Sequence, residues 1–363
     1  MTTLAARVQA LAGRKSIDAV ELAALATDIL AGSGFSSADA RLAADILCDA
    51  QLRGSQSHGL MHLPVYLRGL LDGSVNAAPR YQVDTVANGT AVVDADNALG
   101  VLAGAHVIDL LVPIARRQGI AAAAVRNSNH FGVAGYFVER ATQQGLICMV
   151  FSNASPTMAP TGATEALFGT NPIAFGCPMP GADPVIMDMA TSGVARARIR
   201  QAWREGRTIP SDWALDAAGR PTTDPAAALK GTIQPLGGAK GYGLALVADL
   251  LSSALADGRP GFDVVSVQET VGKPAGVSHF FVVIDPAGFA GAARYDERAG
   301  AIAARVASTV PIDAAAPVRM PGSRGHETRR HARRDGVPLT PALLEALAKA
   351  AGQVDGRVSA RGS

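Results

Sequence analysis

The alternation of strand-like and helix-like segments after Thr90 constrains the fold of this chain more than any other feature of its sequence. Apolar runs predict strands, and amphipathic runs between them predict helices. The strands are expected at 90–96, 120–127, 146–153 and 279–286, and the helices at 102–119 and 135–145. This order is typical of a sheet with helices on both faces, so we expect an α/β protein.

The first 80 residues and the C-terminal end are expected to be helical instead. One helix is predicted over 16–35 with Asp18 near its start, and a second over 36–54 with Ser37 as its N-cap. A further apolar helix is predicted over 340–351. These helices lie outside the alternating region and therefore belong to a second structural unit.

The composition excludes several classes of protein. With 48% hydrophobic residues among 363 and a net charge of +2, the chain can bury a large core and has no overall field that attracts nucleic acid or an anionic membrane. The basic stretch 319–334 contains an acid and no aromatic residue, which favours a solvated helix face over nucleic-acid binding. Three scattered cysteines, no apolar leader and no 18-residue apolar stretch indicate a cytoplasmic protein without a membrane segment.

A search for a dinucleotide site finds neither a G-x-G-x-x-G fingerprint nor a G-x-x-x-x-G-K-[ST] loop. The segment GGAKGYGLALVADLL, residues 237–251, is the nearest match, because it is a glycine-rich turn that leads into a helix. Its glycines let a ligand approach the backbone, the helix start offers free N–H groups, and Lys240 adds a positive charge. A phosphate contact and a tight packing loop both remain open here.

Three further segments carry polar residues inside apolar sequence. The turn at Thr170, Asn171 and Pro172 offers an asparagine amide that matches the carboxamide of nicotinamide, although a plain Asx turn is the alternative. His130 lies between a strand and a helix, where residues line the ligand crevice of α/β sheets. Asp188 follows an apolar strand and is either a cap or a histidine partner.

The segment RGSQSHGLMHLP, residues 53–64, places His58 and His62 four residues apart, on one face if the segment is helical. The pair suits metal binding, acid/base chemistry or packing in the core. The glutamate of an H-E-x-x-H site is absent, because Gly59 follows the first histidine, and no spacing marks a third ligand. We therefore expect no metal, with a packed core position as the alternative to chemistry.

Taken together, seven segments in order resemble the malate/L-lactate dehydrogenase family, which also includes sulfolactate and ureidoglycolate dehydrogenases and Δ1-piperideine-2-carboxylate reductases. They are RGSQSHG, SNHFGVAGYF, GTNPIAFGCP, DMATS, IPSDWALDAAGRPTTDPAAAL, PLGGAKGYGLAL and PGSRGHE. The resemblance implies a non-Rossmann cofactor domain with a mixed sheet, plus a helical domain. It assigns 1–85 to the helical substrate and dimerisation domain, 86–290 to the cofactor domain, and 291–363 to a C-terminal part that returns to the first.

The activity implied by this resemblance is hydride transfer between NAD or NADP and C2 of a small 2-oxo or 2-hydroxy acid, in a homodimer. Two alternatives stay open. One is an NADPH-dependent reductase of cyclic imino acids such as Δ1-piperideine-2-carboxylate or Δ1-pyrroline-2-carboxylate. The other is a relative that binds the ligand without turnover.

The resemblance also implies roles for particular residues. His58 matches an active-site histidine, His130 matches a proton donor/acceptor, and Asp188 matches the aspartate that partners the histidine. Between the two histidines we favour His58 as the proton carrier, because the resemblance supplies its carboxylate. The positions expected to contact the cofactor are Thr170, Asn171, Pro172, Lys240, Pro321, Gly322 and Ser323.

Two positions depart from the family pattern. Many members carry arginine at position 62, where it holds the substrate carboxylate by two hydrogen bonds, but this chain has His62. We expect His62 at the substrate site with Ser57, and Arg53 or another cation as the alternative partner of the acid. Ala197 stands where glycine is common. Because of the histidine at position 62, the resemblance specifies the reaction more closely than it specifies the substrate.

Overall fold

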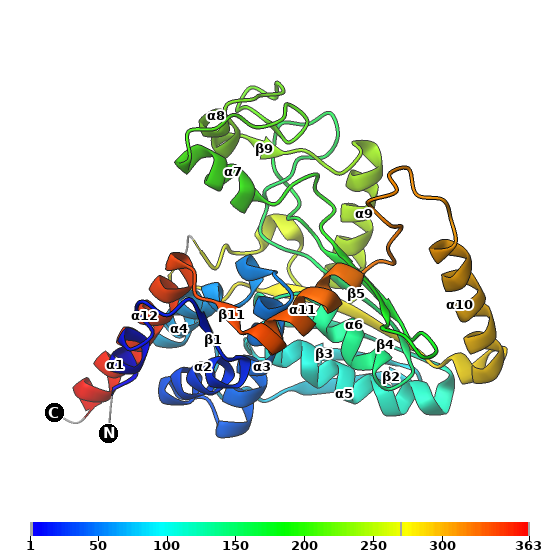
Figure 1. Ribbon diagram of the computed structural model, residues 1–363, viewed down its shortest axis with the longest axis horizontal. Coiled ribbons are helices and arrows are strands. Elements are labelled where there is room, and N and C mark those ends of the chain that lie inside the picture. The colour runs from blue at the N-terminus through cyan, green and yellow to red at the C-terminus, as the bar shows by residue number, and fades with distance from the viewer. Residues whose placement is uncertain (1–2, 269–270, 362–363) are drawn as a thin grey trace.

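A seven-stranded mixed sheet forms the centre of the molecule in the computed structural model, which describes residues 3–268 and 271–361 (Figure 1). The spatial order of the strands is β2-β3-β4-β10-β5-β6-β7. Their bounds are β2 (Gln82–Ala87), β3 (Thr90–Asp94), β4 (Ile120–Ser128), β5 (Ile147–Ser152), β6 (Ile173–Cys177), β7 (Val185–Met189) and β10 (Val277–Ile284). The expected α/β class with a mixed sheet is thus confirmed.

Strand β10 inserts between β4 and β5 and runs antiparallel to both, so that His279 faces Val125 on one side and Ser152 on the other. The pair β3 and β4 is parallel, and the remaining neighbours are antiparallel. As a result, the C-terminal ends of β4, β5 and β7 share one edge of the sheet with the starts of β6 and β10. Polar residues from five separate segments therefore meet at that edge.

Helices cover both faces of the sheet, as the alternation predicted. Helices α5 (Gly100–Gln118) and α6 (Ala134–Thr142) pack on one face, and α9 (Ala239–Asp249) with the π-helical turn Leu250–Ala254 contacts the other. Helix α5 buries Val107, Ile108 and Leu111 against the strands. It ends at Gly119, whose φ of 82° suits a residue without a side chain.

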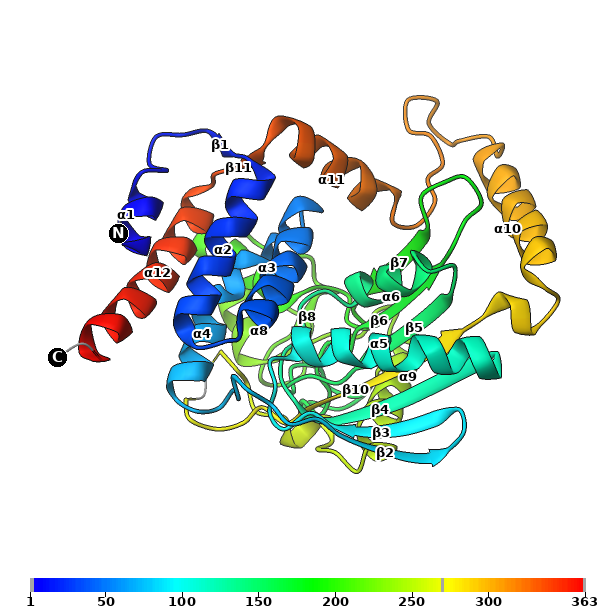
Figure 2. The ribbon, with the colours of Figure 1, turned by 90° about the horizontal axis from the view of Figure 1, so that it is seen from below.

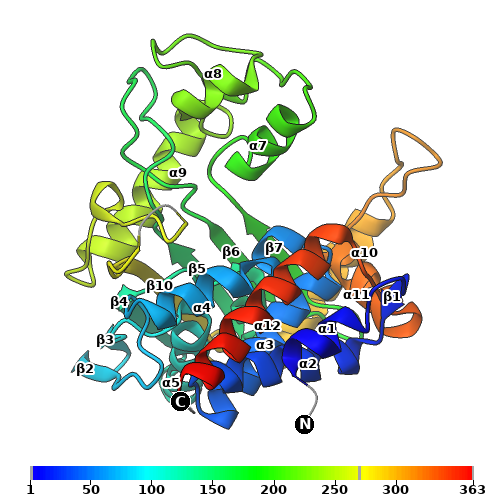
Figure 3. The same cartoon turned by 90° about the vertical axis from the view of Figure 1, so that its left-hand side faces the viewer.

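A helical layer stands beside the sheet and is built from both ends of the chain (Figure 3). It contains α1 (Leu4–Gln9), α2 (Ala19–Ser33), α3 (Ser37–Leu52), α4 (Leu63–Leu71), α11 (Ser323–Asp335) and α12 (Pro341–Arg361). Helix α12 packs against α1, α2 and α4, and a short ribbon joins β1 (Ser16–Ile17) to β11 (Val337–Pro338). The hydrophobic core of this helical layer includes Leu22, Leu30, Leu343 and Leu347.

The caps of α2 and α3 show how local chemistry starts these helices. The Asp18 carboxylate accepts hydrogen bonds from the N–H groups of Val20 and Glu21, which satisfies two free donors at the start of α2. Helix α3 is capped by Ser36 and not by the expected Ser37, because the Ser36 hydroxyl is the one that reaches a free N–H group of the first turn.

Two parts of the chain project from this body. A small lobe contains α7 (Arg196–Arg204), β8 (Ala214–Leu215), α8 (Pro225–Lys230) and β9 (Thr232–Ile233), with a core of its own. Helix α10 (Ala292–Ala307) stands apart on the opposite side from the termini (Figure 2). The chain contributes to the helical layer from α11 onward. In the described part of the chain, no helix has both the length and the apolar content that a membrane span requires.

Candidate functional site

A cavity of about 400 Å³ opens where the sheet edge, the helical layer and the small lobe meet. The sheet edge contributes His130 after β4, Ser152 at the end of β5, and Thr170 before β6. The helical layer contributes His58 and His62. This volume lies within the range of small-molecule and cofactor sites, about 300–1,000 Å³.

The segment that carries His58 and His62 is not an α-helix but two consecutive 3₁₀ turns, Gln56–His58 and Leu60–His62. Gly59 separates them at a close approach to α3, where a Cβ atom would lie 3.0 Å from the carbonyl oxygen of Leu47. A larger residue at this position would push the segment away from α3. The glycine therefore lets both histidines face the cavity from a tightly packed backbone.

His58, His62 and His130 form a stacked cluster that sequence spacing alone did not predict. The ring centroids of His62 and His130 lie 4.6 Å apart at an interplanar angle of 11°. His58 lies 5.9 Å from His62 and 5.7 Å from His130 by the same measure. Face-to-face rings do not converge their nitrogens on one point, and no cluster suited to a metal ion occurs in residues 3–268 and 271–361.

The hydrogen bonds of His130 fix its tautomer. The Tyr66 hydroxyl lies 2.7 Å from Nδ1 of His130, and the N–H group of Gly132 donates to the same nitrogen at 3.4 Å. Because a backbone N–H can only donate, Nδ1 is the acceptor and the neutral ring carries its proton on Nε2. Burial raises the pKa of Tyr66, which keeps its hydroxyl protonated as a donor.

Enclosure favours the neutral form of all three rings. Burial lowers the pKa of His58, and it lowers the pKa of His62 to about 4, with the neighbouring His58 as a second cause. Burial and the other histidines lower the pKa of His130 well below its usual value. At neutral pH the cluster therefore carries no positive charge. His58 Nδ1 lies 2.9 Å from the hydroxyl of Ser57.

Asp188 lines the same cavity as His58, but no hydrogen bond or ion pair between the two occurs in the described ranges 3–268 and 271–361. Its carboxylate accepts a hydrogen bond from the N–H of Gly135, at the start of α6, at 2.7 Å. Burial raises the pKa of Asp188, and this hydrogen bond acts in the opposite direction. The histidine partnership that the resemblance implies for Asp188 is therefore not formed in this structure.

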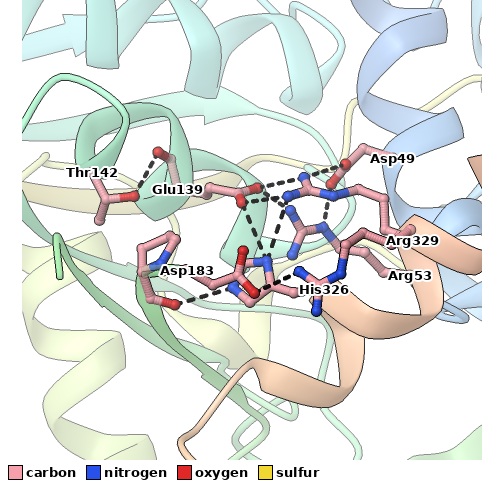
Figure 4. Close-up of polar contacts among 9 residues, drawn as sticks. Asp49, Arg53, Glu139, Thr142, Asp183, His326 and Arg329 are labelled. Atoms are coloured by element: carbon pink, nitrogen blue, oxygen red, sulfur yellow. Dashed lines mark hydrogen bonds and ion pairs between the residues drawn. The ribbon is translucent and has the colours of Figure 1, made fainter. Parts of the chain in front are cut away.

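Arg53 lies outside the cavity, in a buried ion-pair network between α3, α6 and α11 (Figure 4). Its guanidinium donates to Asp49 at 2.6 Å and to Glu139. Arg329 donates to the same two carboxylates, at 3.0 Å each. Because both acids and both arginines are paired, Arg53 is engaged in joining helices and is not directed at a ligand.

The Thr170–Pro172 turn reaches the cavity through Thr170 and Pro172. Asn171 is fully buried, has a φ of 28°, and donates from Nδ2 to the carbonyl oxygen of Ala245. Its Oδ1 atom is buried and has no hydrogen-bond partner among residues 3–268 and 271–361. A buried acceptor without a partner costs about 1–3 kcal/mol, so this turn retains unused hydrogen-bonding capacity beside the cavity.

The remaining expected cofactor positions lie away from the cavity wall. Lys240 is exposed in the first turn of α9. The Pro321–Ser323 turn lies against the edge strand β7, because the Pro321 carbonyl accepts a hydrogen bond from the N–H of Ile186 at 3.2 Å. Gly322 has a φ of 89°, and a Cβ atom there would lie 2.8 Å from the Ile186 carbonyl oxygen. Close packing on β7 thus explains this glycine.

Sequence reasoning missed Arg196 and Arg200, which line the cavity from α7. No motif marks them, because α7 reads as an ordinary polar helix, and only the spacing of four residues placed both on one side. The available signal was their position directly after the DMATS segment, whose aspartate, Asp188, reaches the same cavity.

Comparisons with known proteins agree with this architecture. A family model described as malate/L-lactate dehydrogenase matches residues 17–348. The chain is 39% identical to a (2R)-3-sulfolactate dehydrogenase (NADP(+)) of Chromohalobacter salexigens, over 90% of this chain and 95% of that protein. It is 36% identical to a Δ1-pyrroline-2-carboxylate/Δ1-piperideine-2-carboxylate reductase of Pseudomonas putida, over 90% and 94%. The solved sulfolactate dehydrogenase of Methanocaldococcus jannaschii superposes with a TM-score of 0.86 at 32% identity, over 94% and 97% of the two chains.

Proposed function

Since the chain belongs to the malate/L-lactate dehydrogenase family, we propose that it is an NAD(P)-dependent dehydrogenase that transfers a hydride between the cofactor and C2 of a small 2-oxo or 2-hydroxy acid. The observation that carries the proposal is the neutral histidine cluster in a cavity at the sheet edge. Oxidation of a 2-hydroxy acid requires a base for the hydroxyl proton, and a neutral imidazole near the substrate is such a base.

We assign the base to His58 and an orienting role to His130. Neutral His130 already holds its proton on Nε2, because Nδ1 accepts from Tyr66 and Gly132. It has no free lone pair for the substrate proton, but its Nε2–H is available as a donor. His58 has no such constraint: if Nδ1–H donates to the Ser57 hydroxyl, Nε2 is free to accept the proton. The occupied Nδ1 of His130 therefore supports His58 as the proton carrier, independently of Asp188.

The residues at the sheet edge suit a nicotinamide group. Thr170 and Pro172 line the cavity, and the buried Oδ1 of Asn171, between them in sequence, has no partner in the described part of the chain. We propose that this turn holds the nicotinamide end and that Lys240 and the Pro321–Ser323 turn meet more distant parts of the cofactor. When bound, NAD or NADP supplies or accepts the hydride. The Chromohalobacter relative is named for NADP(+).

Replacing Lys240 by alanine is expected to weaken cofactor binding by about 1.5–3 kcal/mol, because one charge-assisted hydrogen bond to a phosphate is lost. The KM for the acid substrate should change much less. Cofactor titration by fluorescence measures the first effect. Lys230, at the end of α8, is a control whose charge lies on another element. An unchanged titration curve for Lys240→Ala would show that the turn is structural.

We also propose that His62 does not hold the substrate carboxylate as a cation. With a pKa near 4 in the free protein, its ring is charged only in acid and is neutral at pH 7. A charged His62 grip would make substrate KM rise as pH increases through neutrality, because a bound carboxylate would raise the pKa of the ring. We expect instead that KM for the acid is flat across neutral pH. Initial rates measured between about pH 6 and 8, on either side of the usual histidine pKa, test this.

Absorbance at the nicotinamide band tests the activity directly. The enzyme would be incubated with NADH or NADPH and a panel of 2-oxo acids and cyclic imino acids. We expect consumption of the reduced cofactor with at least one 2-oxo acid. Preference for a cyclic imino acid would favour the reductase activity named for the Pseudomonas relative. Binding without turnover across the panel would overturn the proposal and indicate a non-catalytic relative.

We further propose a cytoplasmic homodimer. The three cysteines are free, which suits a reducing compartment. The projecting α10 region exposes Phe289, Ile302 and Ile312, and large exposed apolar groups of this kind are typical of contact surfaces. Sedimentation analysis of the purified protein measures the subunit number.

A further inference from the structure

Among the described residues, two arginine side chains line the cavity, and both come from α7 of the small lobe. Among the described residues that line it, Arg196 and Arg200 are the basic side chains that stay charged at neutral pH, and Asp188 is the acid. Neither arginine forms an ion pair in the parts of the chain that the structure describes. Arg196 donates to the Leu229 carbonyl oxygen at 2.8 Å, and Arg200 donates to Oε1 of Gln268 at 3.0 Å.

These partners hold the two guanidinium groups in place without neutralising them. A carbonyl and an amide are uncharged, whereas Arg53 and Arg329 each face two carboxylates. Arg196 and Arg200 therefore keep a net positive charge inside a partly enclosed cavity. Since charge–charge attraction strengthens when water is excluded, an anion at this wall would bind more tightly than at the open surface.

The positions of Arg196 and Arg200 on α7 direct both side chains toward the cavity. Arg196 and Arg200 are four residues apart and therefore share one side of the helix. Arg198, between them, points elsewhere: its guanidinium carbon lies 5.6 Å from the centre of the Trp213 ring, and it does not line the cavity. Ile199 anchors the helix, because it is fully buried in the core of the lobe.

On the opposite wall, the described lining residues supply no such charge. Position 62 holds a histidine whose pKa is lowered to about 4 by burial and by the neighbouring His58. Arg53, the other expected cation, is paired with Asp49 and Glu139 outside the cavity. A 2-oxo acid has its carboxylate bonded to the carbon that reacts. A cation for that carboxylate must therefore line the cavity that contains His58.

We propose that Arg200, assisted by Arg196, binds the carboxylate of the substrate, so that this chain holds the acid from α7 in the small lobe and not from position 62. The inference rests on the proposed function, because it names the partner of the same substrate. It assigns the charge to the substrate and not to a cofactor phosphate, since the phosphates are separated from the nicotinamide ring by a ribose, whereas the substrate carboxylate is adjacent to C2. Guanidinium binds carboxylates by two hydrogen bonds and stays charged across neutral pH.

Arg200→Gln tests the proposal, with Arg198→Gln as the matched control on the same helix. We expect Arg200→Gln to raise KM for the preferred 2-oxo acid by about 10- to 100-fold, as for the loss of a charge-assisted hydrogen bond, and to leave cofactor affinity near wild type. Arg200→Lys keeps the charge but loses the second hydrogen bond, so its KM should lie between those of the wild type and Arg200→Gln. Arg198→Gln should leave KM within about twofold of wild type, because this side chain does not reach the cavity.

A double variant sharpens the test. His62→Arg places a guanidinium on the opposite wall of the same cavity. In the Arg200→Gln background it should recover a substantial part of the lost affinity if the two positions serve the same carboxylate. Equal KM values for Arg200→Gln and Arg198→Gln would overturn the inference. So would a rise in the cofactor dissociation constant that exceeds the rise in KM, because it would assign Arg200 to the cofactor.

The failure of this inference can be told apart from the failure of the proposed function. If the wild-type enzyme turned over no acid in the panel, the proposed function would fail. Oxalate, which carries the same carboxylate without a reactive C2 carbonyl, would then be titrated by calorimetry in the presence of NADPH. Binding by wild type and Arg198→Gln with a tenfold or greater loss in Arg200→Gln would support the anion site, and equal or absent binding in all three would overturn it.

Discussion

Replacing His58 by alanine is expected to lower kcat by a factor of about 10² to 10⁴ and to leave cofactor affinity near wild type. The magnitude is that of removing a general acid or base from a reaction that transfers a proton with the hydride. His58 lines the cavity, and burial lowers its pKa, so the ring is neutral and ready to accept the hydroxyl proton at neutral pH. Steady-state rates of hydroxy-acid oxidation and a fluorescence titration of the cofactor measure the two effects.

The matched comparison is His130→Ala. If His130 only orients the substrate through Nε2–H, its loss should affect KM as well as kcat, and the fall in kcat should be smaller than for His58→Ala. Tyr66→Phe removes the hydroxyl that holds the tautomer of His130 and should resemble a mild form of His130→Ala. A variant of His58 with wild-type kcat would refute its role, and a larger loss in His130→Ala would reverse the two assignments.

Replacing Glu139 by alanine is expected to lower the free energy of unfolding by about 3–5 kcal/mol, the cost of breaking a buried ion pair by removing one partner. Glu139 is 3% exposed and accepts from both Arg53 and Arg329. Without it, two guanidinium groups share the single carboxylate of Asp49 in a buried setting. Urea unfolding followed by circular dichroism measures the change.

The control for Glu139 is the exposed ion pair formed by the next residue of the same helix. Arg140 of α6 pairs with Asp109 of α5 at 2.8 Å, but the Asp109 side chain is 55% exposed. Asp109→Ala should therefore cost no more than about 1 kcal/mol, as for exposed ion pairs. Equal losses for the two variants would show that the network around Glu139 gains nothing from burial. The network also ends at Arg53, five residues before His58, so its loss should loosen the segment that carries the cavity histidines.

Much of the fold was predictable because its signals are local. Apolar spacing defines α5 and β4, and the Asp18 side chain caps α2 with bonds to N–H groups two and three residues away. Such interactions act within one turn of the chain, so they can be predicted from neighbouring residues in the sequence. The four-residue separation of His58 and His62 likewise brought two rings to one wall, although in 3₁₀ turns and not in an α-helix.

The position of β10 was not predictable in the same way. Its apolar pattern marks a strand, but nothing in residues 277–284 specifies that they insert between β4 and β5, more than 120 residues earlier in the chain. Strand order depends on which apolar faces bury the most surface together, and that is a property of the whole core. The insertion is what brings His130 and Ser152 to the same edge.

The sequence by itself determined the fold class, the Asp18 cap of α2 and the candidate histidines, because each depends on residues a few positions apart. Only the tertiary structure decided which charges face the cavity. Arg53 lies five residues from His58 yet is drawn into a buried network by Glu139, and Arg200, 142 residues from His58, lines the cavity. A charged side chain pairs with an opposite charge, or faces a cavity, only where helix packing brings the two together. Its role therefore depends on distances in space, which cannot be read from the order of residues.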